Sequence, residues 1–426
     1  MAGPADFLQN RRIMKNKKRP AKDRLCVLAQ LCKNIPSYAT AKIARELNQE
    51  KFARTYSAWS HVVSLLFAQL CHSISLADVC DAMALRKSRL SLLRGATAPA
   101  RNTLSHANSR RDPELMERLF WMTLRHLEQS APRFGPHGRY KELPRRFKRA
   151  IYAMDSSTIA LVANCMDWAK HRRRKAAAKL HLSLNLQTFL PSVAVVEEAS
   201  HHDNSRAHIL CAGLQDGEIA LFDKAYIDFS HLYELDQRGV FWVTRAKDNM
   251  DYRVVRKLNC DKSAGILRDD IIRLTGLKTR SAYPCYLRRV VAVVEVDGKE
   301  VQMVFITNNF KWAASSVAAL YLARWAIEVF FKQLKQTLKL SGFIGYSKKA
   351  IQWQIWAALL VWLLARFQSF LVKWPHSFSR LMALLRSHAW ECMSVFDLLR
   401  FHGTAGGLPR MVATVDQAYL PGLEPK

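Results

Sequence analysis

The stretch YLARWAIEVFFKQLKQ, residues 321–336, is apolar around most of a helix, yet it also carries tyrosine, arginine, glutamate and lysine. At about 100° per residue, its polar side chains and one lysine just beyond it fall within an arc of about 80°: Tyr321, Arg324, Glu328, Lys332, Lys335 and Lys339. The pattern predicts a helix that is packed on most sides and has one polar stripe facing a cleft or an anionic partner. An ordinary solvated face with a Glu328–Lys332 pair is the other interpretation.

The ends of this helix and the segment after it also have interpretable patterns. Ser315 or Ser316 can cap its start, and Ser341-Gly342 can end it. A second apolar helix is expected from about Lys348 to Val372. Its most apolar part, IWAALLVWLLA at 355–365, is too short to span a bilayer, so we expect a core helix and no membrane partner.

Two acidic residues follow apolar, strand-like runs elsewhere in the chain. AIYAMDSSTIA at 150–160 contains Asp155, and IALFD at 219–223 ends with Asp223. A carboxylate in such a place is costly to desolvate unless cations or donors meet it. Asp155 could simply cap a turn by accepting from the Ser157 and Thr158 amides. Two such residues nevertheless suggest a site, because ligands of α/β sheets gather at the carboxyl ends of strands.

Asp155, Asp223 and Glu328 together supply the oxygen ligands that two-metal phosphoryl transfer requires. Mg²⁺ prefers carboxylate oxygens and keeps water or phosphate as its other ligands. Two such ions would activate an attacking oxygen and stabilise a leaving one. The arginine and lysines of the stripe would then hold a nucleic-acid backbone.

The net charge supports a polyanionic partner. The 426 residues include 65 Lys+Arg against 35 Asp+Glu, which gives +30 and favours nucleic acid. The run KHRRRK at 170–175 contains Lys170, Arg172, Arg173 and Arg174, and we interpret it as a phosphate-contacting loop, with a merely solvated loop as the alternative. His201-His202-Asp203 is a weak metal candidate, because adjacent ring side chains on a loop seldom chelate one ion.

The cysteines and the N-terminus bear on the compartment. The nine cysteines form no CxxC pair, so reduced thiols in a cytoplasmic protein fit best. The basic residues of the N-terminus are not followed by an apolar segment, which argues against a secretory signal.

The chain divides by texture into helical and strand-rich parts. Helical periodicity dominates up to about residue 130, and strand-like runs follow up to about 308. The predicted boundaries are a basic arm at 1–24, a helical N-terminal domain at 25–135, an α/β core at 145–246 and 309–375, a β-rich insertion at 247–308, and a C-terminal helical tail at 376–426.

The spacing of Tyr321, Arg324, Glu328 and Lys335 resembles the Tyr-Arg-Glu-Lys signature of insertion-sequence transposases of the IS4 family. Asp155-Ser-Ser-Thr resembles the first-Asp motif of that family, and Asp223-Lys-Ala-Tyr resembles its second. The blocks AKLHLSLNLQTFLP, FWVTRAKDN and FITNNF are also similar to family blocks, so the likeness covers roughly residues 25–375.

This resemblance implies an α/β fold with a ribonuclease-H-like core and a metal site made by Asp155, Asp223 and Glu328. It implies a DNA transposase that uses two Mg²⁺ ions, which Mn²⁺ can replace, on double-stranded DNA with terminal inverted repeats. Tyr321, Arg324 and Lys335 would contact DNA phosphates, and a homodimer would bridge two ends. Such a protein would be cytoplasmic and associated with the bacterial nucleoid through DNA.

The turn after Asp223 departs from the family pattern. Ala225 stands where the family usually has glycine and Lys224 where it usually has arginine, and a positive φ in this turn would strain alanine. A catalytically inactive, DNA-binding relic or a repressor of the element is therefore the competing hypothesis. A general nuclease with the same core is a third.

Overall fold

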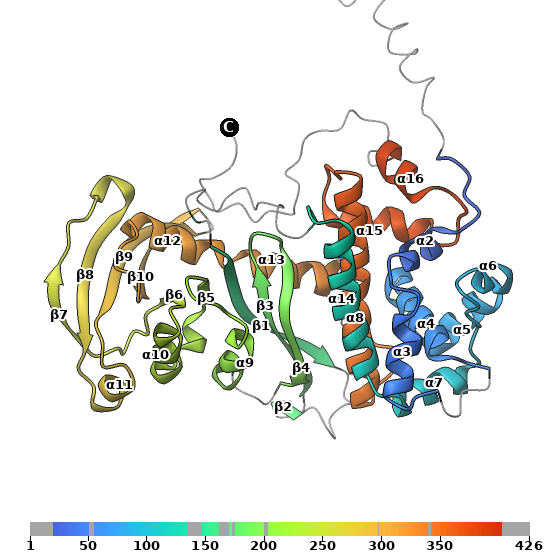
Figure 1. Cartoon of the computed structure of the whole chain (residues 1–426), viewed down its shortest axis with the longest axis horizontal. Coiled ribbons are helices and arrows are strands. Elements are labelled where there is room, and N and C mark those ends of the chain that lie inside the picture. The colour runs from blue at the N-terminus through green and yellow to red at the C-terminus, as the bar shows by residue number, and fades with distance from the viewer. Residues whose placement is uncertain are drawn as a thin grey trace, which may run out of the picture. The chain divides into compact units, whose positions relative to one another are not determined.

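The computed structural model describes residues 20–50, 55–134, 147, 149–161, 170–172, 175–199, 203–296, 298–339 and 342–402 (Figure 1). These residues belong to two compact units. The helical unit takes its residues from 1–130 and 333–416, and the sheet unit takes most of its residues from 131–332.

In the helical unit, every named element longer than one residue is a helix or a helical turn. They are α2 (Val27–Lys33), α3 (Ala39–Glu46), α4 (Ala58–Cys71), α5 (Leu76–Ala84), α6 (Lys87–Ser91), α7 (Arg101–Arg110), α8 (Glu114–Ser130), α14 (Lys348–Leu371), α15 (Phe378–Ser387), α16 (Val395–His402) and a π-helical turn at Gln333–Thr337. Serine side chains cap several starts, such as Ser57 before α4 and Ser347 before α14.

Helix α14 is the central helix of this unit, because it packs against α4, α8 and α7. Trp353, Trp362 and Leu359 on different sides of α14 are all fully buried, which explains why the helix is apolar all round. The predicted helix at 348–372 is thus confirmed. The structure places it with the N-terminal helices, whereas the sequence interpretation grouped 309–375 with the strands.

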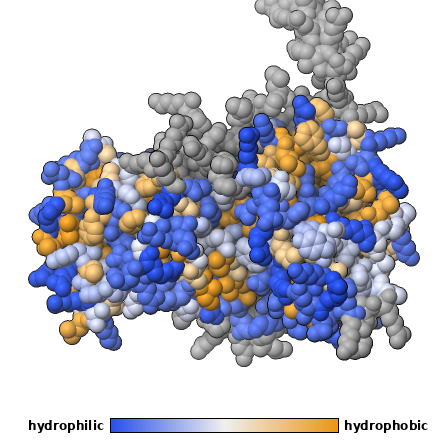
Figure 2. Space-filling model, in the orientation of Figure 1, coloured by the Kyte–Doolittle hydropathy of each residue, from blue (hydrophilic) through white to orange (hydrophobic). Residues whose placement is uncertain are grey.

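Two helical stretches are long and apolar enough to cross a membrane, judged by length and composition alone: Ala314–Lys335 and Lys348–Leu371, or up to three spans if the bent pair α4 and α5 is counted. The expectation that the second stretch is too short was therefore wrong, because the helix extends well beyond the apolar run at 355–365. Buried residues nevertheless make up 83% of its most apolar window. On the face shown in Figure 2, hydrophilic residues cover most of the described surface, and hydrophobic ones lie in small groups.

The sheet unit is built on one mixed sheet with strands in the order β2-β3-β1-β5-β6-β10-β9-β8-β7, and β4 pairs with β3. The strands are β1 (Ile151–Leu161), β2 (Lys170–Arg172), β3 (Lys175–Asn185), β4 (Leu190–Glu198), β5 (Ile219–Phe222), β6 (Phe241–Arg245), β7 (Tyr252–Lys257), β8 (Ile266–Leu274), β9 (Leu287–Val296) and β10 (Lys299–Thr307). Strands β1, β5 and β6 are parallel, and the other pairings are antiparallel.

The remaining helices of the sheet unit are α9 (Ala207–Cys211), α10 (Phe229–Gln237), α11 (Leu277–Ala282), α12 (Ala314–Ala323) and α13 (Ala326–Lys332). Phe222 of β5 packs in one apolar cluster with Leu210 of α9 and Leu232 of α10. Side chains alternate along a strand, so Leu221 and Asp223 point to the opposite face. Helix α12 contacts β5 and α13 contacts β1. The two Asp side chains therefore point to the face covered by α12 and α13.

The predicted β-rich insertion at 247–308 contains strands β7–β10 and helix α11. Strand β10 pairs antiparallel with β6, so these strands extend the sheet rather than forming a separate one. Strands β9 and β10 make a hairpin in which Val296 pairs with Lys299. Gly298 follows in the turn of this hairpin with a φ of 73°, which favours glycine, and Asp297 lies outside the described residues.

The helix predicted to run from about 315 to 341 differs from the observed structure in three ways. It begins at Ala314 with Ala313 as N-cap and no side-chain cap, so the expected serine cap was wrong. Its hydrogen bonding changes at Arg324 and Trp325, whose N–H groups donate to Tyr321 and Leu322 three residues back, both at 3.1 Å. This tighter turn separates α12 from α13. The helical segment ends with the π-helical turn at Gln333–Thr337.

The basic run at 170–175 was predicted to be a loop, and this was wrong for its ends. Lys170–Arg172 forms β2, and Lys175 begins β3; the two strands pair antiparallel, with Arg172 opposite Lys175. Arg173 and Arg174 lie outside the described residues. The two ends of the basic run therefore lie in two hydrogen-bonded strands.

Candidate active site

Asp155 and Asp223 lie side by side because β1 and β5 are parallel and in register. The last pair of the ladder is Met154 with Phe222, so the two aspartates are the next residues on adjacent strands. Strand β1 does not end at Asp155, as had been expected, because residues 155–161 go on pairing with β3. The Asp155 carboxylate accepts from the Ser156 amide at 2.8 Å, rather than from Ser157 and Thr158 as the turn-capping interpretation required.

Helices α12 and α13 bring the polar stripe of the quoted stretch to these aspartates. The Arg324 guanidinium donates to Asp155 Oδ2 and to Glu328 Oε1, both at 3.1 Å. The Tyr321 hydroxyl donates to Asp223 Oδ1 at 3.4 Å. The three predicted carboxylates are thus linked to one another through Arg324 and Tyr321.

Tyr321 and Arg324 are both buried, and each supports the other. The Arg324 guanidinium lies 5.5 Å from the centre of the Tyr321 ring. The ring centres of Tyr321 and Phe305 of β10 are 4.9 Å apart. Only 6% of the Arg324 side chain is exposed, whereas 56% of the Glu328 side chain is exposed. The site therefore has a buried floor and one acidic group that reaches solvent.

The electrostatics of this floor depend on burial and on opposite charges. Burial raises the pKa of Asp155 to about 6; Arg324 and the Ser156 amide act against this, and the Asp223 charge adds to it. Burial alone would lower the pKa of Arg324, but the neighbouring Asp155, Tyr321 and Glu328 raise it overall. Arg324 is therefore the cation that keeps a buried carboxylate ionised at neutral pH.

The donor set fits a hard divalent cation, since all three acidic groups offer carboxylate oxygens. The oxygens of Asp155, Asp223 and Glu328 do not all lie within 4.8 Å of one another in the described part of the chain. Because Arg324 donates to both Asp155 and Glu328, a bound cation would share these oxygens with the guanidinium or replace it.

Lys332 and Lys335, the other predicted DNA-contacting residues whose side chains the structure describes, do not join this group of contacts. Lys332 is exposed at the end of α13. Lys335 lies in the π-helical turn, which belongs to the helical unit, and burial lowers its pKa. Lys170 and Arg172 are on β2, and Arg173 and Arg174 lie outside the described residues.

Ala225 does not carry the strain that the sequence suggested. It lies in the 3₁₀ turn Lys224–Tyr226, which starts after Asp223 at φ −75° and ψ 160°. Ala225 is not among the described non-glycine residues with positive φ. The replacement of the usual glycine is therefore compatible with this turn.

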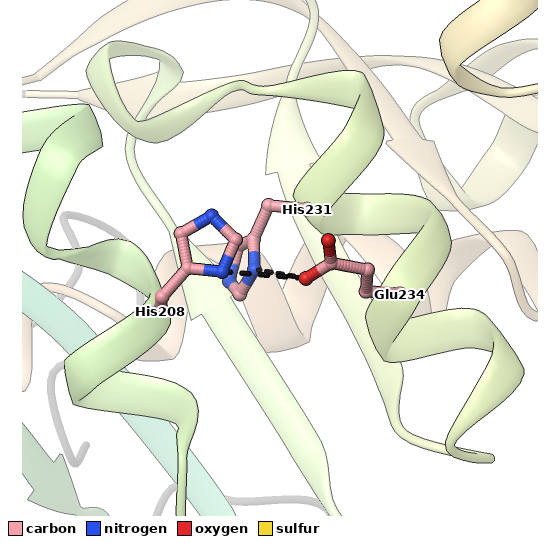
Figure 3. Close-up of side chains that lie close together, drawn as sticks. All are labelled: His208, His231 and Glu234. Atoms are coloured by element: carbon pink, nitrogen blue, oxygen red, sulfur yellow. Dashed lines mark ion pairs between the residues drawn. The ribbon is translucent and has the colours of Figure 1, made fainter.

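A second cluster of titratable side chains escaped the sequence interpretation. His208 of α9 lies beside His231 and Glu234 of α10, and the ligand atoms of all three lie within 4.8 Å of one another (Figure 3). His231 and Glu234 are three residues apart, a spacing that puts two side chains on one helix face. The spacing of His231 and Glu234 was visible in the sequence, but only the fold brings His208 next to them.

The fold and the site define a mixed α/β protein with two carboxylates at neighbouring positions on adjacent parallel strands, covered by a helix that carries the third acid. The family model for the transposase DDE domain matches residues 146–364, which is more than half of the chain, so the chain belongs to this family. This membership confirms the resemblance and defines a polynucleotidyl transferase class of enzyme. A domain of unknown function, DUF4372, matches residues 23–93.

Several relatives support membership of the IS4 family. A putative transposase of Sinorhizobium fredii is 28% identical over 63% of this chain and 71% of the relative. A probable transposase for the insertion sequence element IS5377 of Geobacillus stearothermophilus is 28% identical over 52% of this chain and 57% of the relative. The transposase InsG for IS4 of Escherichia coli is 25% identical over 45% of this chain and 43% of the relative.

A solved structure of the piggyBac transposase synaptic complex with hairpin DNA matches 90% of this chain and 84% of the other, with a TM-score of 0.42 and 10% identity.

Proposed function

We propose that this chain is the DNA transposase of an insertion sequence, which binds terminal inverted repeats and catalyses metal-dependent strand cleavage and strand transfer. The observation that carries this proposal is the contact of Asp155, Asp223 and Glu328 through Arg324 and Tyr321. The net charge of +30 supports DNA as the partner, because phosphate neutralisation dominates affinity for nucleic acid.

The catalytic core in this proposal is a ribonuclease-H-like fold made of β1, β3, β4, β5 and β6. Its support is the strand order β4-β3-β1-β5-β6, in which three antiparallel strands are followed by parallel ones, with α9 and α10 as connections. Strands β7–β10 would be the β-rich insertion between this core and the helix that carries Glu328. The helices at 25–135 would form the DNA-binding domain.

Each residue of the site would have a separate role. Asp155, Asp223 and Glu328 would hold two Mg²⁺ ions, for which Mn²⁺ can substitute, and these would lower the barrier for attack on a phosphodiester. Tyr321 orients Asp223, and Arg324 holds Asp155 and Glu328 in place. When DNA enters, the guanidinium of Arg324 would be available for a phosphate oxygen, together with exposed Lys332.

The proposed reaction has two steps. A water molecule attacks the phosphodiester at the element end, which leaves a 3′-hydroxyl on one side and a 5′-phosphate on the other. The 3′-hydroxyl then attacks a phosphodiester of target DNA and releases the 3′-oxygen of the target strand. We further propose that a cytoplasmic homodimer holds both element ends during these steps.

Nicking of a labelled duplex that contains the element end, measured with and without Mg²⁺, tests this function. Asp155→Asn and Glu328→Gln are expected to reduce nicking by more than about 100-fold. Loss of a residue that only hydrogen-bonds a metal ligand already lowers metal affinity or activity by about 10–100-fold, and these two residues would be ligands themselves. The control is Glu295→Gln, which changes an exposed carboxylate on β9 and should nick like the unchanged protein. Equal nicking by Asp155→Asn and the unchanged protein would show that the assigned site is wrong.

The competing functions give different outcomes in the same assay. An inactive relic or repressor would bind the element end without nicking it at any metal concentration. A general nuclease would cut duplexes without element ends equally well. The main sequence argument for the relic was strain at Ala225, and the 3₁₀ turn after Asp223 removes it.

A further inference from the structure

The histidine cluster on α9 and α10 has the geometry of a metal site. His208 Nδ1 lies 3.3 Å from Glu234 Oε2, and His231 Nδ1 lies 3.7 Å from the same oxygen. Tetrahedral Zn²⁺ with bonds of about 2.0–2.1 Å would place neighbouring ligand atoms about 3.3 Å apart. The three atoms shown in Figure 3 therefore need only small movements to surround one ion.

The buried histidine of the cluster lacks the hydrogen bonds that a buried polar ring needs. Its side chain is only 2% exposed, and both Nδ1 and Nε2 of His231 are buried with no hydrogen-bond partner. A polar group buried in this way costs free energy unless a ligand meets it. Burial lowers the pKa of His231 to about 4; the neighbouring His208 acts in the same direction, and Glu234 acts against it.

We propose that His208, His231 and Glu234 bind a transition-metal ion of the Zn²⁺ type, separate from the carboxylate site. Imidazole nitrogens suit Zn²⁺, Co²⁺, Ni²⁺ and Cu²⁺, whereas Mg²⁺ prefers oxygen ligands only. His208 and Glu234 are exposed, so water completes the coordination and the ion enters from solvent.

The expected effect of this ion is to fasten α9 to α10. His231 also packs against Phe222, with ring centres 6.4 Å apart, and Phe222 is the residue before Asp223. A metal on His231 would therefore restrict the motion of the end of β5, which is followed by Asp223, one of the proposed catalytic aspartates. This metal site does not depend on the proposed reaction, because it rests on residues on the opposite face of β5.

Metal uptake by the full-length protein tests the proposal. Zn²⁺ binding is measured by equilibrium dialysis in excess Mg²⁺, which occupies sites made of carboxylates alone. The variants are His208→Ala and Glu234→Gln, which change exposed side chains and should leave folding intact. His126→Ala, an exposed histidine on α8, is the matched control.

The unchanged protein and His126→Ala are expected to take up one more Zn²⁺ than either cluster variant, and loss of a ligand should weaken that site more than about 100-fold. Zn²⁺ at 100 times its dissociation constant should raise Tm by about 3 °C in the unchanged protein and not in His208→Ala. Co²⁺ should give the absorption of a tetrahedral nitrogen-containing site in the unchanged protein and in His126→Ala, and not in His208→Ala or Glu234→Gln.

The proposal is overturned if His208→Ala and the unchanged protein bind Zn²⁺ equally, which would leave a simple histidine–glutamate ion pair. It is also overturned if excess Mg²⁺ displaces the ion, because the site would then be one of oxygen ligands. Neither result bears on nicking at element ends, so failure here is distinct from failure of the proposed transposase.

Discussion

The two faces of β5 carry two groups of acidic and basic side chains that are arranged in opposite ways. On one face, Asp223 and Asp155 meet Arg324, a buried cation that donates to two carboxylates. On the other face, His231 is buried, neither of its ring nitrogens has a hydrogen-bond partner, and its Nδ1 lies 3.7 Å from Glu234 Oε2. The first group is therefore balanced by the protein itself, whereas the second is incomplete without a ligand.

This difference indicates which ions each face can accept. The carboxylate face offers hard oxygens and already contains a positive charge, so an added cation would have to share or replace the contacts of Arg324. The histidine face offers two neutral nitrogens and one carboxylate, a set that favours borderline metals. One fold can thus hold two kinds of metal site on opposite faces of a single short strand.

Replacing Arg324 by methionine should have the largest effect on stability. The change leaves the Asp155 carboxylate without its cation, and we expect this to lower the free energy of unfolding by about 3 kcal/mol. Thermal unfolding should then show Tm lower by about 3 °C. Mg²⁺ should restore part of the loss, because it supplies the missing positive charge.

The control for this change is Arg268→Met, which alters an exposed arginine on β8 and should leave Tm nearly unchanged. An Arg324→Met protein as stable as the control would mean that Arg324 does not balance Asp155. The asymmetry between the two faces of β5 would then not hold.

Replacing His231 by phenylalanine should have a smaller effect and the opposite sign. In metal-free protein it removes two unpaired buried nitrogens, so stability should rise by up to about 1 kcal/mol. The same change should abolish the Zn²⁺-dependent rise in Tm. Thermal unfolding with a chelator and with Zn²⁺ measures both effects.

His61→Phe is the matched comparison, because His61 is also fully buried but its Nε2 bonds Asn108 Oδ1 at 2.8 Å. That substitution should destabilise the protein by about 1–2 kcal/mol, since it leaves the Asn108 side chain without this partner. If both substitutions lower the free energy of unfolding equally, His231 has a polar partner in solution and needs no metal to satisfy its ring nitrogens.

Replacing Lys332 by alanine should have the smallest effect. Lys332 is exposed at the end of α13, so it should contribute one phosphate contact. The slope of log affinity against log salt should fall by about 1, with similar weakening for all DNA sequences. Lys278→Ala on α11, another exposed lysine, is the control; equal slopes for both variants would remove Lys332 from the proposed DNA path.

Much of the carboxylate site was predictable because its residues repeat at regular spacing. Tyr321, Arg324 and Glu328 recur at intervals of three and four residues, which puts side chains on one face of any helical segment. Asp155 and Asp223 follow apolar runs whose strands the structure confirms as β1 and β5. Local periodicity therefore predicted both the elements and the face on which their polar residues lie.

The details that failed depend on hydrogen bonds that the sequence pattern does not show. The strand-like run at 150–160 was confirmed as β1, but Asp155 is not at a strand end as expected, because the residues after it go on pairing with β3. The break at Arg324 and Trp325 was also missed, since helical periodicity barely changes over one tight turn.

The sequence by itself determined which side chains share a helix face or precede a strand end, because these relations follow from the repeat of the backbone. It also determined the family, through motifs at fixed spacing. Only the tertiary structure decided that Arg324 bridges Asp155 and Glu328, that Ala225 is unstrained, and that His208 meets His231 and Glu234. Those outcomes depend on which elements pack together, and packing joins residues whose separation along the chain carries no periodic signal.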